Sequence, residues 1–285
     1  MKLGILCSGG LGYSTLVKLV DKYPVNFVFT DSKSISIIEL CRNNSIPVFI
    51  GNPRKGKAKK FIKENTCNVL ISINYLFIIE QDVINMGTDL TFNIHGSLLP
   101  KYRGRTPHVW AIINDEKQTG ITAHVIDEGC DTGSIIEQVV IPIDIKDTGN
   151  DVLVKYHKHY VPLIEKVIAK YKEGTITFKS QKEDEATYFG KRTPSDGQIN
   201  WNWQRKRIFN WVRAQANPYP GAYTFYGDMR LTIDEVSLSN YGFDYSMENG
   251  RILSTTPLLV KTPNGVLEVI SMRGNIKLKK GALLI

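Results

Sequence analysis

The sequence predicts an α/β fold, with helices on both faces of a mostly parallel sheet and a smaller C-terminal β-rich domain after it. Apolar strand-like runs alternate with helical patterns in the first half of the chain, which favours parallel pairing through crossover connections. From Ala222 onward the pattern changes to short strand-like runs separated by turns. The first arrangement is Rossmann-like, and the second is typical of a small barrel or sandwich.

The elements of the first half follow from apolar periodicity, taken in chain order. Strands are expected at 2–7, 25–30, 48–50, 69–74 and 90–95, and helices at 14–20, 35–43 and 58–64. Two more strands, at 121–126 and 135–143, flank a polar loop, and a long amphipathic helix follows at 151–171. Residues 69–74 are continuously apolar, as in a strand buried on both faces.

A change in composition divides the chain into three segments. The first domain is expected over 1–180, a polar linker over 181–205, and the small β-rich domain over 206–285. In the last segment, strand-like runs such as AYTFY and GVLEVI alternate with turns.

Composition and charge narrow the classes of protein to consider. The 285 residues carry a formal net charge of +8, which suits an anionic substrate such as a nucleotide or an RNA without choosing between them. The N-terminal run resembles a strand rather than a signal peptide, and no apolar run is long enough to span a bilayer, so we expect a cytoplasmic protein that has no membrane partner. Four scattered cysteines form no C-x-x-C pair, and we expect neither a disulfide framework nor a metal.

Asn93 and His95 form the most informative pair in the sequence. They stand two residues apart at the end of an expected strand, so their side chains point to the same face. A glycine and a proline-containing loop follow at once, which delivers the pair to the edge of the sheet. With Asp131 from the polar loop after 121–126, they offer an amide, an imidazole and a carboxylate. This set suits acyl-type transfer.

Other polar residues have plainer interpretations. The fingerprint of a dinucleotide site is broken, because Thr15 stands where its third glycine belongs. We expect His124 to be a core residue rather than a site wall, and His108 to be a surface or cap residue. His157 and His159 are expected to be exposed on the long helix.

Residues 93–104, with the sequence NIHGSLLPKYRG, resemble the signature of the folate-dependent formyltransferases. The runs at 118–122 (QTGIT) and 131–133 (DTG) are similar to the second block of that family. The resemblance implies an N-formyltransferase with a catalytic domain over 1–180 and with Asn93, His95 and Asp131 as its catalytic residues.

Two regions after the first domain are similar to nucleotide-sugar N-formyltransferases, residues 186–194 (ATYFGKRTP) and residues 212–222. The loop at 8–12 and the short stretch at 31–45 differ from the methionyl-tRNA enzymes. The resemblance therefore implies a dTDP-linked 3- or 4-amino-dideoxyhexose as substrate, with a UDP-linked aminosugar less favoured. The implied pathway is surface polysaccharide biosynthesis, such as that of lipopolysaccharide O-antigen.

Two alternatives stay open at the level of sequence. One is methionyl-tRNA formylation. The other is a non-catalytic nucleic-acid-binding protein, in which aromatic side chains of the β-rich domain stack on bases. We prefer core packing or a dimer face for those aromatic residues.

The resemblance also implies a mechanism and its contacts. The formyl donor is N10-formyltetrahydrofolate or N5-formyltetrahydrofolate, and the protein is expected to be a homodimer. Asn93 and His95 would donate hydrogen bonds to the oxyanion of a tetrahedral intermediate, while Asp131 orients His95 or accepts the proton of the amine. Cofactor contacts are expected at Asn74, Tyr75, Leu76, Ile126, Asp127 and Asp131. Substrate contacts are expected at Ser97, Lys101, Tyr102, Arg103 and Arg105, with a solvated loop as the alternative for 101–105.

Overall fold

The computed structural model describes residues 1–274 and 276–285 and divides the chain into two compact units. Unit 1 comprises 1–104, 120–141 and 155–188, and unit 2 comprises 105–119, 142–154 and 189–285. Across the described residues, no helix combines the length and apolar character that a bilayer crossing requires.

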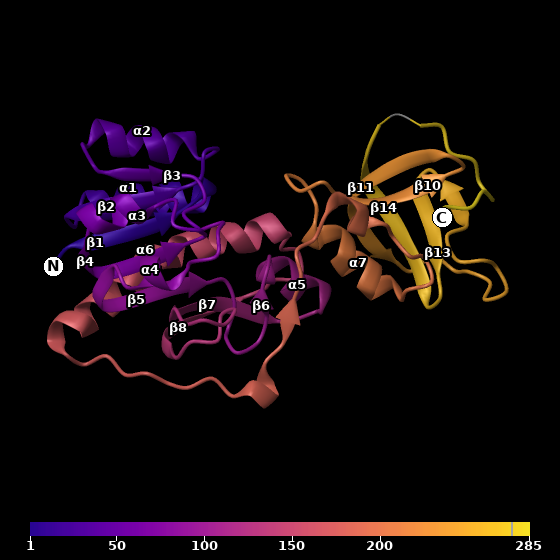
Figure 1. Cartoon of the computed structure of the whole chain (residues 1–285). Helices are drawn as coiled ribbons and strands as arrows, with labels where there is room; N and C mark the ends of the chain where they lie inside the picture. The colour runs from indigo at the N-terminus through magenta and orange to yellow at the C-terminus, as the bar shows by residue number, and fades with distance from the viewer. Residues whose placement is uncertain (275) are drawn as a thin grey trace. The chain divides into compact units, whose positions relative to one another are not determined.

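Unit 1 is built on a seven-stranded sheet with the order β3-β2-β1-β4-β5-β7-β8 (Figure 1). The strands are β1 (Leu3–Cys7), β2 (Val25–Thr30), β3 (Val48–Ile50), β4 (Cys67–Ile73), β5 (Gly87–His95), β7 (Gln118–Val125) and β8 (Ile135–Pro142). Neighbours from β3 to β5 pair in parallel, whereas β5 pairs antiparallel with β7. The expected mostly parallel sheet is therefore confirmed.

Helices of unit 1 connect these strands and cover the sheet on both faces. They are α1 (Gly9–Val20), α2 (Ile35–Asn43), α3 (Lys59–Glu64), α4 (Gln81–Ile84) and α6 (Gly149–Glu173), most of which belongs to unit 1. Unit 2 contains α5 (Pro107–Ile113) and α7 (Arg205–Ala214). The long helix predicted at 151–171 corresponds to α6. Ser14 on α1 lies 3.1 Å from the Nδ1 atom of His157 on α6, and Lys22 forms a 2.6 Å ion pair with Glu165.

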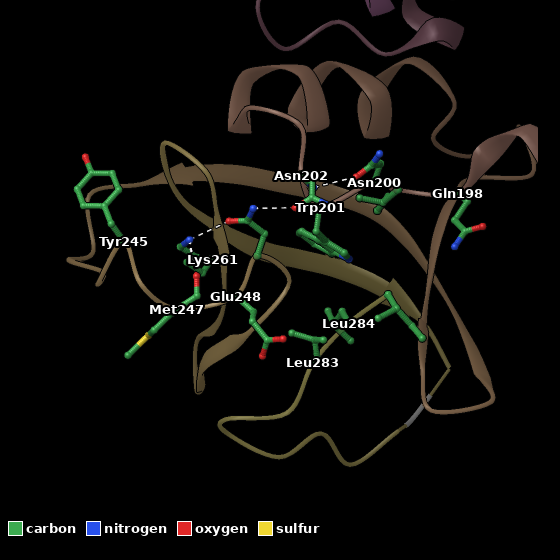
Figure 2. Close-up of a pocket in the computed structure, with 13 residues that line it drawn as sticks. Gln198, Asn200, Trp201, Asn202, Tyr245, Met247, Glu248, Lys261, Leu283 and Leu284 are labelled. Carbon is green, nitrogen blue, oxygen red and sulfur yellow. Dashed lines mark hydrogen bonds between the residues drawn. The ribbon is translucent and has the colours of Figure 1, made fainter.

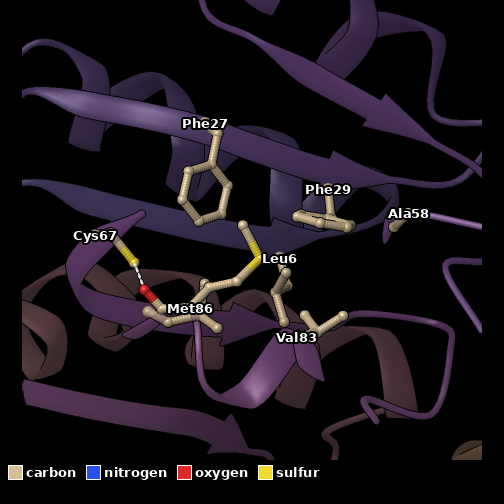
Figure 3. Close-up of a cluster of buried hydrophobic side chains, with 8 residues drawn as sticks. Leu6, Phe27, Phe29, Ala58, Cys67, Val83 and Met86 are labelled. Atoms are coloured by element: carbon tan, nitrogen blue, oxygen red, sulfur yellow. Dashed lines mark hydrogen bonds between the residues drawn. The ribbon is translucent and has the colours of Figure 1, made fainter. Parts of the chain in front are cut away.

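A cluster of buried apolar side chains fixes one face of the sheet (Figure 3). Phe27 and Phe29 stand two residues apart on β2 and so point to the same face, with ring centroids 5.9 Å apart. Leu70 on β4 and Val83 on α4 complete the contact between sheet and helix. Full burial of each such side chain stabilises the folded state by about 1.5–3 kcal/mol, so this cluster stabilises the contact between the sheet and α4.

The register of the parallel strands brings their carboxyl ends level. Cys7 at the end of β1 pairs with Ile73 at the end of β4, and Ile73 pairs with Ile94 on β5. The residues that follow these strands therefore emerge at one edge, where ligands bind in open α/β sheets. His95 is the last residue of β5 and lies at this edge.

Unit 2 contains a five-stranded antiparallel sheet with the order β10-β11-β14-β13-β12. Its strands are β10 (Ala222–Tyr226), β11 (Met229–Ser239), β12 (Ile252–Thr255), β13 (Leu258–Thr262) and β14 (Gly265–Arg273). The expected β-rich C-terminal domain is confirmed. Two short strands, β6 (Arg103–Gly104) and β9 (Tyr188–Phe189), pair with each other.

Candidate active site

The antiparallel pairing of β5 with β7 gives Asn93 a polar neighbour. Asn93 lies directly opposite His124, and its Nδ2 atom is 3.1 Å from the Nε2 atom of His124. The other ring nitrogen, Nδ1, lies 2.8 Å from the Val125 carbonyl oxygen. Because a carbonyl only accepts, Nδ1 of His124 donates to it, which leaves Nε2 to accept from the Asn93 amide. His124 is buried, as expected of a core residue, and it also lies against Asn93 and Asp131.

The backbone of the following loop fixes the ring of His95. The Nε2 atom lies 2.8 Å from the carbonyl oxygen of Tyr102, a residue held at φ +61°. This nitrogen must donate, since the carbonyl can only accept. The free nitrogen, Nδ1, lies 3.4 Å from Oδ2 of Asp131. His95 therefore offers Nδ1, and not Nε2, for proton transfer.

Asp131 reaches the two imidazoles from a left-handed backbone conformation, with φ +57°. The backbone N–H of Gly104 donates to Oδ2 over 2.9 Å, and Oδ1 lies 3.5 Å from Nε2 of His124. Burial alone would raise the pKa of Asp131, but the neighbouring His95 and His124 rings and the hydrogen bond from the Gly104 N–H outweigh it and hold the pKa well below its usual range. Asp131 is therefore an anion at neutral pH.

Burial has the opposite consequence for His95. Loss of hydration lowers the pKa of His95 below its usual value, and the neighbouring Asp131 carboxylate opposes part of that shift. The ring is thus neutral near pH 7, with a lone pair on Nδ1 beside a fixed negative charge. This arrangement can accept a proton and then stabilise the imidazolium that forms.

The three expected cofactor contacts that follow β4 differ in their hydrogen bonding and in their exposure. Asn74, at φ +52°, donates from Nδ2 to the carbonyl of Ser8 over 3.1 Å. Tyr75 has a buried hydroxyl for which the described residues supply no hydrogen-bond partner, and the next side chain, Leu76, is 44% exposed. Tyr75 packs against the buried apolar cluster of the sheet, so Leu76 is the side chain of this pair that faces outward.

The loop after β7 supplies the other expected cofactor contacts. The backbone N–H of Ile126 donates to the carbonyl of Thr91 over 3.2 Å. The Asp127 carboxylate accepts from the Gly129 N–H and from the Thr132 hydroxyl, so it shapes the loop that presents Asp131. Asp127 thus stabilises its own loop through hydrogen bonds, a role that the sequence did not predict.

The five expected substrate contacts separate into two groups. Ser97, Tyr102 and Arg103 are buried, whereas Lys101 and Arg105 are exposed. The Ser97 hydroxyl donates to the Lys101 carbonyl over 2.6 Å. The alternative of a solvated loop at 101–105 is wrong for Arg103. Its side chain is 0% exposed, and its guanidinium N–H groups donate to other residues of unit 1. Because Arg103 is a charged residue in a polar run, it was expected to contact solvent or a phosphate of the substrate. Its actual partners could not be predicted locally, since they lie about 80 residues further along the chain.

Two further expectations require correction. His108 is buried rather than at the surface, and its Nε2 atom lies 2.8 Å from the Tyr219 hydroxyl. His157 and His159 are half-buried rather than exposed. In the part of the chain that the structure describes, no group of three His, Cys, Asp or Glu side chains could hold a metal ion.

Unit 2 has a pocket of its own, with a volume of about 760 Å³, around Trp201 (Figure 2). Its polar groups already engage one another: the Lys261 ammonium donates to the Asn249 side chain over 2.8 Å, and Asn249 donates to Asn202 over 2.8 Å. None of the catalytic, cofactor or substrate residues predicted from the sequence lines this pocket. The candidate active site is therefore the edge of the sheet in unit 1.

Comparison with known proteins gives two family matches. Residues 17–168 match the family described as formyl transferase, and residues 191–280 match the formyl transferase C-terminal domain.

The chain is also similar in fold to several solved structures. One is WlaRD, a sugar 3N-formyl transferase in the presence of dTDP and 5-N-formyl-THF (21% identity, 97% of this chain and 99% of that one, TM-score 0.74). Another is the N-formyltransferase of Helicobacter canadensis in complex with folinic acid and dTDP-3-aminofucose (23% identity, 94% and 99%, TM-score 0.71). A third is a 4-N formyltransferase of Francisella tularensis (24% identity, 78% and 91%, TM-score 0.66).

Proposed function

The chain belongs to the formyl transferase family, and we propose that it transfers a formyl group from formyl-tetrahydrofolate to the amine of a nucleotide-linked aminosugar. The substrate we favour is a dTDP-linked 3- or 4-amino-dideoxyhexose used for surface polysaccharide. The likeness to sugar formyltransferases crystallised with dTDP or a dTDP-aminosugar supports this choice. The observation that carries the chemistry is the position of the His95 ring, whose Nε2 atom faces the Tyr102 carbonyl and whose Nδ1 atom lies 3.4 Å from the Asp131 carboxylate.

His95 acts as the proton acceptor in this proposal. The amine nitrogen attacks the formyl carbon and forms the new C–N bond, and Nδ1 of His95 takes the proton that the nitrogen loses. The same Nδ1–H then returns the proton to the folate nitrogen as the old C–N bond breaks. Because Nε2 is committed to Tyr102, the ring serves first as a base rather than as the oxyanion donor expected from the sequence.

Asn93 stabilises the charge that develops on the formyl oxygen. One N–H of its amide is held by His124, and the second remains for the oxygen. A donor fixed before the reaction costs no reorganisation when the charge forms. Asp131 stabilises the imidazolium rather than accepting the amine proton itself, since its depressed pKa makes it a weak base.

The formyl donor supplies the one-carbon group, and this chain would hold it at the edge of the sheet in unit 1. Tyr75 and Leu76 would contact the pterin, and the backbone of the loop that Asp127 shapes would meet its polar edge. For the nucleotide diphosphate, we propose Lys101 and Arg105, whose side chains are exposed.

A formylation assay tests the proposal. The protein is incubated with N10- or N5-formyl-tetrahydrofolate and a panel of dTDP- and UDP-linked 3- and 4-amino-dideoxyhexoses, with methionyl-tRNA as a further acceptor. We expect mass spectrometry to show the gain of one formyl group on a dTDP-linked sugar. His95→Asn should slow that gain by about 10²- to 10⁴-fold, and His159→Asn on α6 is the matched control. Formylation of methionyl-tRNA alone would overturn the choice of acceptor.

The family match argues against a non-catalytic nucleic-acid-binding protein. We further propose that the enzyme is cytoplasmic and acts as a homodimer. Light scattering coupled to size exclusion gives the oligomeric state, and a monomeric mass in the active fraction would contradict a homodimer.

A further inference from the structure

Arg103 is a fully buried cation that the proposed reaction does not use. Its guanidinium forms a fork with Glu183: Nη2 donates to Oε1 over 2.7 Å and Nη1 to Oε2 over 2.9 Å. Nη1 also donates to the Tyr188 hydroxyl. Two further N–H groups, on Nε and Nη2, converge on Oε1 of Gln181 over 3.1 and 2.9 Å. A charge is buried this completely only where its hydrogen bonds are satisfied, so Arg103 is an internal anchor.

Gln181 links this anchor to the loop that carries Asp131. While its oxygen accepts from Arg103, its Nε2 atom donates to the carbonyls of Asp131 (2.8 Å) and Gly133 (2.7 Å). A guanidinium only donates and a carbonyl only accepts, so the orientation of the Gln181 amide is fixed at both ends.

The Asp131 loop needs such support. A left-handed backbone at a residue other than glycine costs roughly 1–2 kcal/mol, and Asp131 adopts it. The loop also packs tightly, because a Cβ atom on Gly133 would lie 1.9 Å from the Val125 carbonyl oxygen. The Gly104 N–H holds the carboxylate of Asp131, and Gln181 holds its carbonyl.

We propose that Arg103 and Gln181 are positioning residues: Arg103 orients the Gln181 amide, and Gln181 fixes the backbone of Asp131 so that its carboxylate faces His95. The inference rests on the proposed function for its catalytic consequence, but not for its structural one. Gln181 lies between the two matched family regions, 17–168 and 191–280.

The first test measures His95 directly. The Gln181→Met variant keeps the length of the side chain but removes its acceptor and both of its donors. Histidine ¹⁵N NMR then follows the titration of His95, assigned with His95→Asn. The groups that face this ring are the Asp131 carboxylate, the His124 ring (centroids 6.4 Å apart) and the Tyr102 carbonyl. Because the carboxylate opposes the lowering of the His95 pKa, its displacement should move the titration to lower pH, by about half a unit or more.

The matched control is Lys182→Met on the neighbouring residue. Lys182 is exposed and pairs with Glu185 over 2.8 Å, so its loss should leave the titration unchanged. An unshifted His95 in folded Gln181→Met would overturn the proposal. An equal shift in Lys182→Met would overturn it too, because the effect would then be general to the segment.

Kinetics provide the second test. In Gln181→Met we expect kcat to fall about 10- to 100-fold with little change in KM, because misplacing a catalytic group by about 1 Å costs rate rather than binding. Should the wild-type protein formylate no aminosugar, the proposed function fails, while the NMR titration still decides the positioning role.

Arg103 is tested through its coupling to Gln181. The Arg103→Met variant should shift the His95 titration in the same direction, and the double variant should shift it no further than Gln181→Met alone. If Arg103→Met folds and leaves His95 unshifted, Arg103 has no part in positioning. If it does not fold, Gln181→Met alone decides whether the proposal stands.

Discussion

His95 in unit 1 and His108 in unit 2 are both buried histidines, but different groups face them. His95 lies 3.4 Å from the Asp131 carboxylate, whereas His108 lies 2.8 Å from the neutral hydroxyl of Tyr219. Burial lowers the pKa of both rings, to about 4 for His108. At His95 the carboxylate opposes that shift. The same side chain is thus able to exchange a proton in one region and is held neutral in the other.

The difference shows that burial alone does not make a catalytic histidine. His108 stands near the start of α5, where a neutral ring packs and bonds without carrying charge. His95 combines burial with a fixed anion and with a backbone carbonyl that selects its tautomer.

The largest effect is expected from the same substitution at both histidines. His95→Asn should lower kcat by about 10²- to 10⁴-fold, since it removes the proton acceptor. His108→Asn should leave kcat within about 10-fold and lower the free energy of unfolding by about 1–3 kcal/mol, because it disturbs a buried hydrogen bond. Steady-state kinetics and urea unfolding measure the two quantities. Equal losses of kcat at both positions would end the distinction between the two regions.

A smaller effect is expected at His124. The His124→Leu variant should lower kcat by roughly 10-fold or more, because the Asn93 amide loses the acceptor that orients it. His124→Gln, whose carbonyl can accept from Asn93, should recover part of the rate. No difference between the two variants would show that His124 acts through bulk alone.

The stability of the protein should depend on pH through His108. The unfolded chain binds a proton near pH 6.5, whereas the folded chain binds it only near pH 4, so stability is lost as the pH falls through that window. The loss amounts to roughly 2–3 kcal/mol. Comparing the free energies of unfolding of wild type and His108→Gln at pH 8, 6 and 4.5 measures it. The variant should lose less than wild type on acidification, and parallel curves would contradict the assignment.

The smallest effect is expected at Cys130, the exposed cysteine beside Asp131. Burial raises the pKa of the Cys41 thiol to about 11 and that of Cys67 to about 12, and burial also raises the pKa of Cys7. Ellman's reagent should therefore react rapidly with one thiol of the native protein and with four after denaturation. Cys130→Ser should remove the rapid reaction and change kcat by less than about 3-fold. Rapid reaction in this variant would show that a second thiol is accessible.

The local sequence pattern predicted the strands, and it predicted that the side chains of Asn93 and His95 share one face of β5. The two-residue spacing of Asn93 and His95 was sufficient, because alternation along a strand is a local property. The contact of His124 with Asn93 could not be predicted, because it depends on the antiparallel register that places the two residues opposite each other. Gln181 gave no signal at all, since it meets the Asp131 loop 50 residues away in sequence through an ordinary polar side chain. Arg103 was taken for a ligand contact because burial of a charge depends on partners that no nearby residue reveals.

The hydrogen bond from Nε2 of His95 to the Tyr102 carbonyl has a consequence for inhibitor design. Beside the Asp131 carboxylate, Nδ1 of His95 can then accept, and the second N–H of Asn93 can donate. A competitive ligand should therefore present an N–H next to a carbonyl, as a formamide or a urea does. A compound with its donor and acceptor exchanged should bind poorly. Its acceptor would face the lone pair on Nδ1 of His95, and its donor would face the N–H of Asn93.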